Sequence, residues 1–290
     1  MSKLRMAVSR LLALGGLTAV SGTSYVLYKY SSFNEKVDCR GAVYGKKDFE
    51  PVLNSQAKWD DDWDCRKIQI KKDLISLEPQ EITHSLKNVD EKPKPTATRH
   101  VILVRHGQYI TKDSDEERIL TDIGRQQAAA TALRLKSLNI SFNKITVSTM
   151  TRAKETGVII SDQMPEVPIE YCSLIREGAP YPPEPPSKSW NPERWVTFYK
   201  DNPRIEGAFR KYIHRADSSQ KEDSFEVLVC HGNVIRYFVC RALQFPPEGW
   251  LRMSIGNCGI TWLTIRPNGS VSLRGLGDVG HLPPELITFN

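Results

Sequence analysis

Short apolar runs alternate with longer amphipathic segments from residue 99 onward. The runs are continuous and rich in β-branched residues, which is typical of strands buried on both faces of a sheet. A turn sequence, RPNGSV (266–271), predicts a terminal hairpin. The predicted strands are HVILV (100–104), KITVS (144–148), PIEYCS (168–173), EVLVC (226–230) and GITWLTI (259–265).

Three segments among these strands carry apolar residues at helical spacing. They are TDIGRQQAAATALRLKSL (121–138), which begins with a threonine suited to an N-cap, TRAKETGVIISDQM (151–164) and NVIRYFVCRALQF (233–245). Strands that alternate with helices form mostly parallel sheets covered on both faces. The pattern therefore predicts an α/β fold, a three-layer α/β/α sandwich, in a domain that spans residues 99–290.

The first 29 residues (1–29) predict a targeting segment or membrane anchor. LLALGGLTAVSGTSYVLY (11–28) contains no charge and lies between Arg10 and Lys29. As a helix it would span about 27 Å, close to the hydrocarbon thickness of a bilayer. The basic, acid-free start favours an uncleaved anchor of mitochondrial type over a secretory signal peptide, whose apolar region is usually shorter. A cleaved presequence is the alternative.

Residues 30–98 predict a linker, because their apolar periodicity is poor and DEKPKPTAT (90–98) resists helix formation. Within this linker lies WDDDWD (59–64), where Trp59 and Trp63 would share one face of a helical turn. The segment either docks into another surface, including another copy of this chain, or caps the 99–290 domain of its own chain. The sequence leaves both readings open.

Composition and charge narrow the possible partners. Hydrophobic residues make up 40% and charged residues 26% of the 290, with a net charge of +6. This balance fits an anionic substrate or a membrane surface, and the lack of a dense Lys/Arg block argues against nucleic acid. The six cysteines form no CxxC pair and no zinc-type cluster, so we expect mostly free thiols, a reducing compartment and no metal site. A secreted protein with some disulfides is the alternative.

Basic side chains follow three of the predicted strands. Arg105 and His106 come after the first strand, Arg152 comes shortly after the second, and His231 follows the strand that ends at residue 230. Because ligands bind beyond the carboxyl ends of parallel strands, we expect these side chains to share one crevice. Guanidinium groups bind phosphate oxygens in bidentate geometry, so the set indicates a phosphate site.

A phosphate monoester in this crevice needs a nucleophile and an acid. One of the two imidazoles would attack phosphorus and become a phosphohistidine. The ester oxygen leaves poorly unless it is protonated, and Glu177 in LIREGAP (174–180) is the candidate proton donor. Taken singly, each of these residues has an ordinary structural reading, such as a surface salt bridge or an exposed loop position. Only their joint placement at strand ends favours a site.

Five motifs lie along the domain: VRHGQ (104–108), LTDIGRQQA (120–128), STMTRAKET (148–156), REG (176–178) and CHGNVIR (230–236). In order and spacing they resemble the histidine phosphatase superfamily, also called the phosphoglycerate mutase-like family. The resemblance implies a phosphoglycerate mutase-like fold over roughly residues 99–280 and no cofactor or metal. It implies that His106 is the nucleophile, that Arg105 and Arg152 hold the phosphoryl group with Gly107, that His231 stabilises the transferring oxygens and that Glu177 donates the proton.

Longer stretches, such as IREGAPYPPEPP and VIRYFVCRALQFPPEGWLR, resemble a mitochondrial branch of that family. The resemblance implies a serine/threonine protein phosphatase in the outer or inner mitochondrial membrane, with one membrane span. It implies phosphorylated protein substrates, among them stress-activated kinases, and a role in apoptosis and necroptosis signalling. It also implies a homo-oligomer formed through Trp59, Asp60, Trp63 and Asp64.

Three other functions are compatible with the sequence. A small-molecule phosphomonoesterase or mutase would use the same residues. The stretch after Glu177 is proline-rich and predicts a stiff rim, not a basic lid, which suits a phosphorylated side chain of a protein. Cys230 and Arg236 satisfy the C-x5-R spacing of cysteine-dependent phosphatases, but the intervening HGNVI lacks a central glycine. A non-catalytic scaffold that binds through residues 59–64 is the third.

Overall fold

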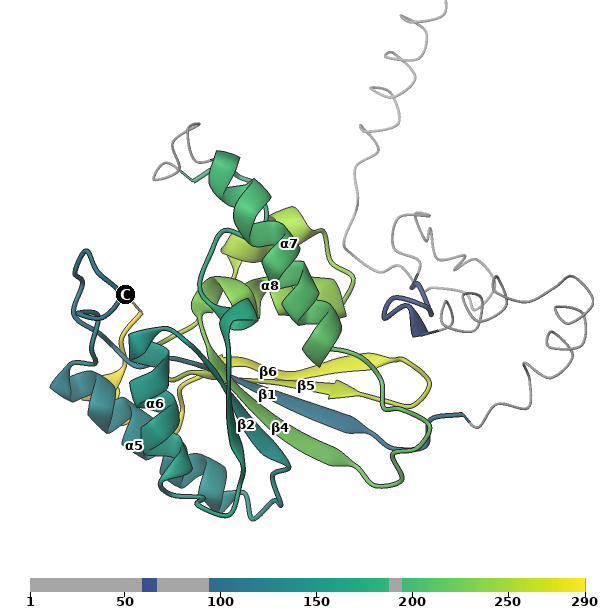
Figure 1. Ribbon diagram of the computed structural model, residues 1–290, viewed down its shortest axis with the longest axis horizontal. Helices are drawn as coiled ribbons and strands as arrows, with labels where there is room; N and C mark the ends of the chain where they lie inside the picture. Colours follow the sequence, from purple (N-terminus) through teal and green to yellow (C-terminus); the bar gives the residue numbers. More distant parts are fainter. Residues whose placement is uncertain (1–58, 67–93, 188–194, 290) are drawn as a thin grey trace, which may run out of the picture. The chain divides into compact units, whose positions relative to one another are not determined.

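The computed structural model describes residues 59–66, 94–187 and 195–289 (Figure 1). The chain divides into two compact units, Met1–Lys58 and Trp59–Asn290, and the fold below is that of the second. The predicted anchor (11–28) lies outside the described residues. None of the helices in the described part is long and apolar enough to span a bilayer.

Six strands form a single mixed sheet in the order β3-β2-β4-β1-β5-β6. The first four strands in this order are parallel, and β5 and β6 add an antiparallel hairpin at one edge. This confirms the predicted strands and the terminal hairpin. Their bounds are β1 (Arg99–Arg105), β2 (Lys144–Ser148), β3 (Ile169–Cys172), β4 (Ser224–Cys230), β5 (Ile260–Ile265) and β6 (Val271–Asp278).

The helices confirm the three predicted segments and add a fourth. Thr121 caps α5, where its hydroxyl oxygen accepts a hydrogen bond from the N–H of Gly124 at 3.0 Å. The sequence did not predict α7, which contains Pro203. The α-helices are α5 (Asp122–Ser137), α6 (Thr151–Ser161), α7 (Trp195–Tyr212) and α8 (Gly232–Ala242), and the short 3-10 helices are η3 (Ser173–Ile175), η5 (Pro247–Arg252) and η6 (Pro284–Leu286).

Successive residues of β1 enter two different cores. Val101 and Leu103 pack with residues of α7 and α8 on one face of the sheet, whereas Ile102 and Val104 pack with residues of α5 and α6 on the other. Figure 1 shows these two pairs of helices on opposite faces of the sheet. Because side chains alternate along a strand, a continuous apolar run fills both cores. The predicted three-layer α/β/α sandwich is confirmed.

The parallel strands end together at one edge of the sheet. Arg105 at the end of β1 pairs with Cys230 at the end of β4, and Ser148 at the end of β2 pairs with Cys172 at the end of β3. The residues that directly follow these strands therefore emerge side by side. This edge holds the candidate site.

Candidate active site

The site is built around the loop that follows β1. The N–H of His106 donates to the carbonyl of Cys230 at 2.9 Å, which fixes the loop against the end of β4. A side chain at Gly107 would come within 2.6 Å of the carbonyl oxygen of Gly124 in α5, so this close approach requires glycine. The N–H of Gly107 donates to Thr156 Oγ1 at 3.0 Å. A phosphate contact from Gly107 stays a prediction.

His106 has a defined tautomer. Its ring is only 2% exposed, and its Nδ1 lies 2.8 Å from the carbonyl oxygen of Gly107. Arg152 Nε lies 3.2 Å from the other ring nitrogen, Nε2. Arginine can only donate, so Nε2 is the acceptor and Nδ1 carries the proton. Burial, together with the charges of Arg152 and Arg105, lowers the pKa of His106 well below its usual range. The imidazole is therefore neutral, with its lone pair on Nε2.

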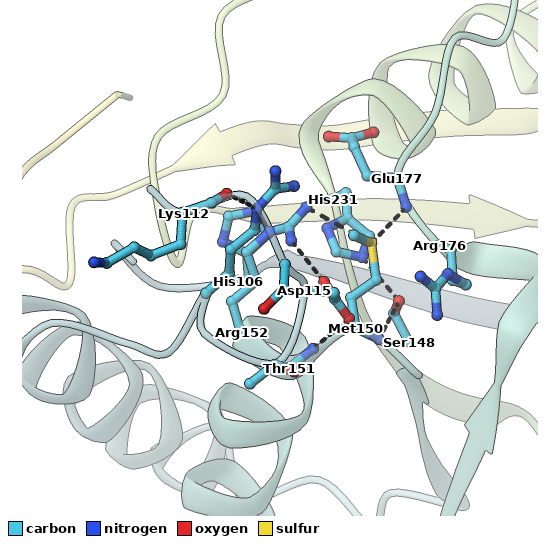
Figure 2. Close-up of polar contacts among 12 residues, drawn as sticks. His106, Lys112, Asp115, Ser148, Met150, Thr151, Arg152, Arg176, Glu177 and His231 are labelled. Carbon is cyan, nitrogen blue, oxygen red and sulfur yellow. Dashed lines mark hydrogen bonds and ion pairs between the residues drawn. The ribbon is translucent and has the colours of Figure 1, made fainter. Parts of the chain in front are cut away.

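Arg152 is buried in the first turn of α6 and is held from several sides. Its Nη1 lies 3.4 Å from Asp115 Oδ1, its Nη2 lies 3.6 Å from Met150 Sδ, and its guanidinium stacks 4.7 Å from the ring centre of Tyr109. Figure 2 shows Arg152 with His106 and His231, with Asp115 and Met150 beside it. These contacts fix the guanidinium next to Nε2 of His106.

Arg105 supplies a second guanidinium to the same edge of the sheet. Its Nη1 donates to the carbonyl of Ile255 at 2.7 Å, and its backbone carbonyl accepts from the N–H of Cys258 at 3.1 Å. Burial lowers the pKa of Arg105, and the charge of Glu177 acts in the opposite direction. The side chain stays charged, because a guanidinium is protonated at any physiological pH.

His231 faces His106 at the N-terminus of α8, with the two ring centres 5.1 Å apart. Its Nε2 lies 2.8 Å from Ser148 Oγ, and its buried Nδ1 has no hydrogen-bond partner among the described residues. Burial, with the neighbouring His106 and Arg152, lowers the pKa of His231 well below its usual range. When the Ser148 hydroxyl donates to Nε2, Nδ1 carries a proton that a phosphoryl oxygen can accept.

Glu177 follows η3 in a loop that two elements hold in place. Its Oε1 accepts from the N–H of Gly178 at 3.1 Å, and its Oε2 accepts from the N–H of Asn233 at 3.5 Å. Arg204 of α7 donates to the carbonyl of Glu177 at 3.2 Å. Burial raises the pKa of Glu177, and the hydrogen bonds and the charges of Arg152 and Arg105 reduce that shift. The carboxyl thus keeps a proton to higher pH than an exposed glutamate.

The assembled groups suit an anion with several oxygens. Two guanidinium groups and an imidazole N–H can bind phosphoryl oxygens around a neutral imidazole lone pair, and a carboxyl of raised pKa stands beside them. Within the part of the chain that the structure describes, no group of three or more His, Cys, Asp or Glu side chains is placed to hold a metal ion.

Cys230 is placed as a core residue. It is fully buried at the end of β4, and burial raises the pKa of its thiol. A nucleophilic cysteine needs the opposite shift. The structure therefore gives no support to a cysteine-dependent phosphatase. The other described cysteines, Cys65, Cys172, Cys240 and Cys258, are also free thiols, as expected, and Cys39 lies outside the described residues.

Three residues of the site were not assigned from the sequence. Ser148 bonds His231, Asp115 bonds Arg152, and Asn233 bonds the loop of Glu177. Ser148 ends a predicted strand, so its position was a signal for a site residue. Asp115 stands in a charged loop, TKDSDEER (111–118), in which the sequence does not distinguish it from the neighbouring acidic residues.

The Trp-Asp segment (59–64) packs on the same chain in this structure. Trp63 is buried against Phe209, and its Nε1 donates to the carbonyl of Gly269 at 2.8 Å. Asp64 is buried too and accepts hydrogen bonds from the guanidinium of Arg215 at 2.6 and 2.9 Å. Trp59 packs on the same core, and the N–H of Asp60 donates to Gln244 Oε1 at 2.7 Å. Among the described residues, these contacts match the capping reading.

Comparisons with known proteins find a matching family and several similar proteins. Residues 101–276 match the family described as "Histidine phosphatase superfamily (branch 1)". The mouse protein named "Serine/threonine-protein phosphatase PGAM5, mitochondrial" is 53% identical over 235 residues, which cover 79% of this chain and 80% of the mouse protein.

Two further proteins are similar to this chain. The Caenorhabditis elegans protein named "Serine/threonine-protein phosphatase Pgam5, mitochondrial" is 46% identical over 287 residues, which cover 97% of this chain and 99% of that protein. A crystal structure of a phosphoglycerate mutase from Plasmodium falciparum has 38% identity and a TM-score of 0.47, and the similarity covers 67% of this chain and 100% of that one.

Proposed function

Because this chain belongs to the histidine phosphatase superfamily, branch 1, we propose that it is a serine/threonine protein phosphatase that acts through a phosphohistidine at His106. The curated mouse and Caenorhabditis elegans relatives carry this activity in their names. The observation that carries the mechanism is the neutral, buried imidazole of His106, whose lone-pair nitrogen lies 3.2 Å from Arg152 Nε.

The reaction has two steps. In the first, His106 Nε2 forms a bond to phosphorus, the bond from phosphorus to the serine or threonine oxygen breaks, and Glu177 gives its proton to that oxygen. In the second, water attacks the phosphohistidine, the carboxylate of Glu177 takes the proton of the water, and inorganic phosphate leaves. The imidazole and the carboxyl then have their starting protonation states.

Charge stabilisation comes from the residues around the nucleophile. Arg152 and Arg105 neutralise the phosphate dianion, which otherwise repels a nucleophile. The Nδ1 of His231 donates to an oxygen of the transferring phosphoryl group. Arg152, Arg105 and His231 are also held by other contacts of the protein. When His106 attacks, the Nε–H of Arg152 passes from His106 Nε2 to a phosphoryl oxygen.

The surroundings of Glu177 support a protein as the substrate. The loop after Glu177 contains Pro180 and Pro182, and with Phe198, Tyr199 and Pro203 of α7 it lines a cavity of about 250 Å³. An apolar hollow along the loop that follows Glu177 can accommodate a side chain of a polypeptide substrate.

A rapid-quench experiment tests this function. Full-length protein mixed with a ³²P-labelled phosphoserine peptide and quenched in alkaline denaturant is expected to carry label in a phosphoramidate linkage, which His106→Asn abolishes and Cys230→Ser leaves intact. Label that depends on Cys230 would overturn the assignment. Isomerisation of 3-phosphoglycerate without phosphopeptide hydrolysis would instead establish a mutase. Absence of both activities would favour a non-catalytic scaffold.

The cellular context is a further part of the proposal. We propose a mitochondrial location with residues 11–28 as a single-pass anchor, on the basis of that uncharged stretch and the names of the relatives. Phosphorylated proteins, among them stress-activated kinases in apoptosis and necroptosis signalling, are the proposed substrates. We also propose a homo-oligomer in which the Trp-Asp segment contributes to the interface. Imaging of the chain with and without residues 1–29 tests the location.

A further inference from the structure

Asn233, in the first turn of α8, joins three parts of the site. Its backbone N–H donates to Glu177 Oε2 at 3.5 Å, and its side-chain Nδ2 donates to the carbonyl of Gly178 at 3.1 Å. Its Oδ1 accepts from Arg236 Nη1 at 3.1 Å. One residue thus contacts the carboxyl of the proposed proton donor and also the backbone of the loop that carries it.

Arg236 fixes which way the Asn233 amide points. An amide can rotate to exchange its oxygen and nitrogen, but arginine can only donate, so the group facing Arg236 is the oxygen. The Nδ2 group then has to face the carbonyl of Gly178, which can only accept. Both contacts are satisfied in a single orientation, and the reverse orientation would place two donors together and two acceptors together.

Arg236 makes no ion pair with a carboxylate among the described residues, although it lies half-buried in α8. Its Nη1 donates a hydrogen bond to Asn233, and its buried Nε has no hydrogen-bond partner among the described residues. It is also close to a like charge. A Cβ at Gly232 would lie 3.6 Å from Arg105 Nε and 3.7 Å from Arg236 Nη1. Two guanidinium groups on either side of one glycine repel each other, whereas the negative charge of Glu177 stabilises the charged form of Arg236.

We propose that Asn233, oriented by Arg236, is a positioning residue for the proton donor Glu177. It holds the loop at Gly178 and directs one carboxyl oxygen, so that the acid faces the departing ester oxygen. The inference rests on the proposed function and deepens it, because it assigns the residues that make Glu177 effective as an acid. Misplacement of a catalytic group by about 1 Å can cost on the order of 100-fold in rate.

The leaving group of the substrate separates this role from a general structural one. The alkoxide of serine is a poor leaving group and needs the proton of Glu177, whereas p-nitrophenolate leaves without one. A variant that misplaces the acid should therefore lose activity on a phosphoserine peptide and keep most of its activity on p-nitrophenyl phosphate. Loss of fold or of phosphate binding would reduce both activities together.

The test compares kcat/KM for both substrates in full-length Asn233→Asp, Asn233→Ala and Arg236→Gln. Asn233→Asp keeps the acceptor for Arg236 and removes the donor to Gly178. We expect each variant to lower the ratio of phosphoserine to p-nitrophenyl phosphate activity by roughly 10- to 100-fold, and Arg236→Lys to restore part of it. Asn268→Ala, in the exposed hairpin turn, is the matched asparagine control.

Equal losses on both substrates, or no loss on either, would overturn the inference. Glu177→Gln is measured beside these variants as the benchmark for the acid itself. If Glu177→Gln leaves the ratio unchanged, the proposed role of Glu177 fails and the positioning role fails with it. If Glu177→Gln lowers the ratio and the Asn233 variants do not, only the positioning inference is wrong.

Discussion

Arg152 donates its Nε proton to Nε2 of His106 across 3.2 Å, although the two residues are 46 positions apart in the sequence. The contact joins the loop after β1 to the first turn of α6. In the proposed mechanism, a phosphoryl group bound by Arg152 would lie next to the imidazole nitrogen that carries the lone pair. Binding and attack would then depend on the same pair of side chains.

Arg152→Lys should reduce kcat/KM by about 100-fold or more, because lysine has no planar fork and no Nε–H beside His106. The charge is kept, so the loss measures geometry. Steady-state kinetics with a phosphoserine peptide checks this, and Arg134→Lys on the exposed face of α5 is the control that should change little. Equal activity of the two variants would show that Arg152 contributes only its charge.

The rate of the phosphorylation step should depend on pH in a way set by Glu177 and His106. Burial raises the pKa of Glu177, so the acid stays protonated to higher pH, and the rate should fall as pH rises through that raised pKa. Burial lowers the pKa of His106 well below its usual range, so the nucleophile stays neutral on the acid side. Single-turnover rates against pH check this. An acid limb at or above the ordinary histidine pKa would contradict it.

Gly124→Ala should disrupt the site without touching a substrate group. A Cβ at Gly124 would overlap the carbonyl oxygen of Gln108, a backbone atom that cannot move aside. We expect a large fall in activity and in melting temperature. Gly207→Ala in α7 is the matched control, since its Cβ would meet no atom within 4 Å, and it should stabilise the helix by about 1 kcal/mol. Thermal unfolding of both variants measures these changes in stability, and equal melting temperatures would contradict the prediction.

Asp64→Ala should lower the free energy of unfolding by about 3–5 kcal/mol, because it removes the carboxylate that pairs with the buried guanidinium of Arg215. Asp61→Ala in the same segment is the control, since only the backbone carbonyl of Asp61 bonds Arg215. Denaturant unfolding gives the free energies, and light scattering gives the size of the assembly. An Asp64→Ala protein with an unchanged free energy of unfolding and an unchanged assembly size would argue against any structural role for the segment.

Much of the fold could be predicted because its strands and three helices follow simple patterns. The helix α7 could not, since Asp201-Asn202-Pro203 looks like a turn and a proline inside a helix removes a hydrogen bond. Packing overrides this local preference. Phe198, Ile205 and Phe209 lie at helical spacing and are buried, and Ile205 and Phe209 pack in the core on that face of the sheet.

The candidate site, too, could be predicted from the sequence only in part. His106, Arg152 and His231 were found at strand ends, where topology alone brings them together. The residues that hold Arg152 and the Glu177 loop were not found, because no local pattern links Asp115 to Arg152 across 37 positions or Asn233 to Gly178 across 55. Such contacts depend on side-chain directions that appear only when the whole sheet is assembled.

The carbonyl of Gly107 has a chemical consequence for the covalent intermediate. By accepting the proton of Nδ1 at 2.8 Å, it leaves the far nitrogen of the imidazole as the only nucleophile. The enzyme should therefore form the tele isomer of phosphohistidine and none of the pros isomer. Isomer-specific antibodies would then recognise a single form of the trapped protein, and that form would report turnover in cells.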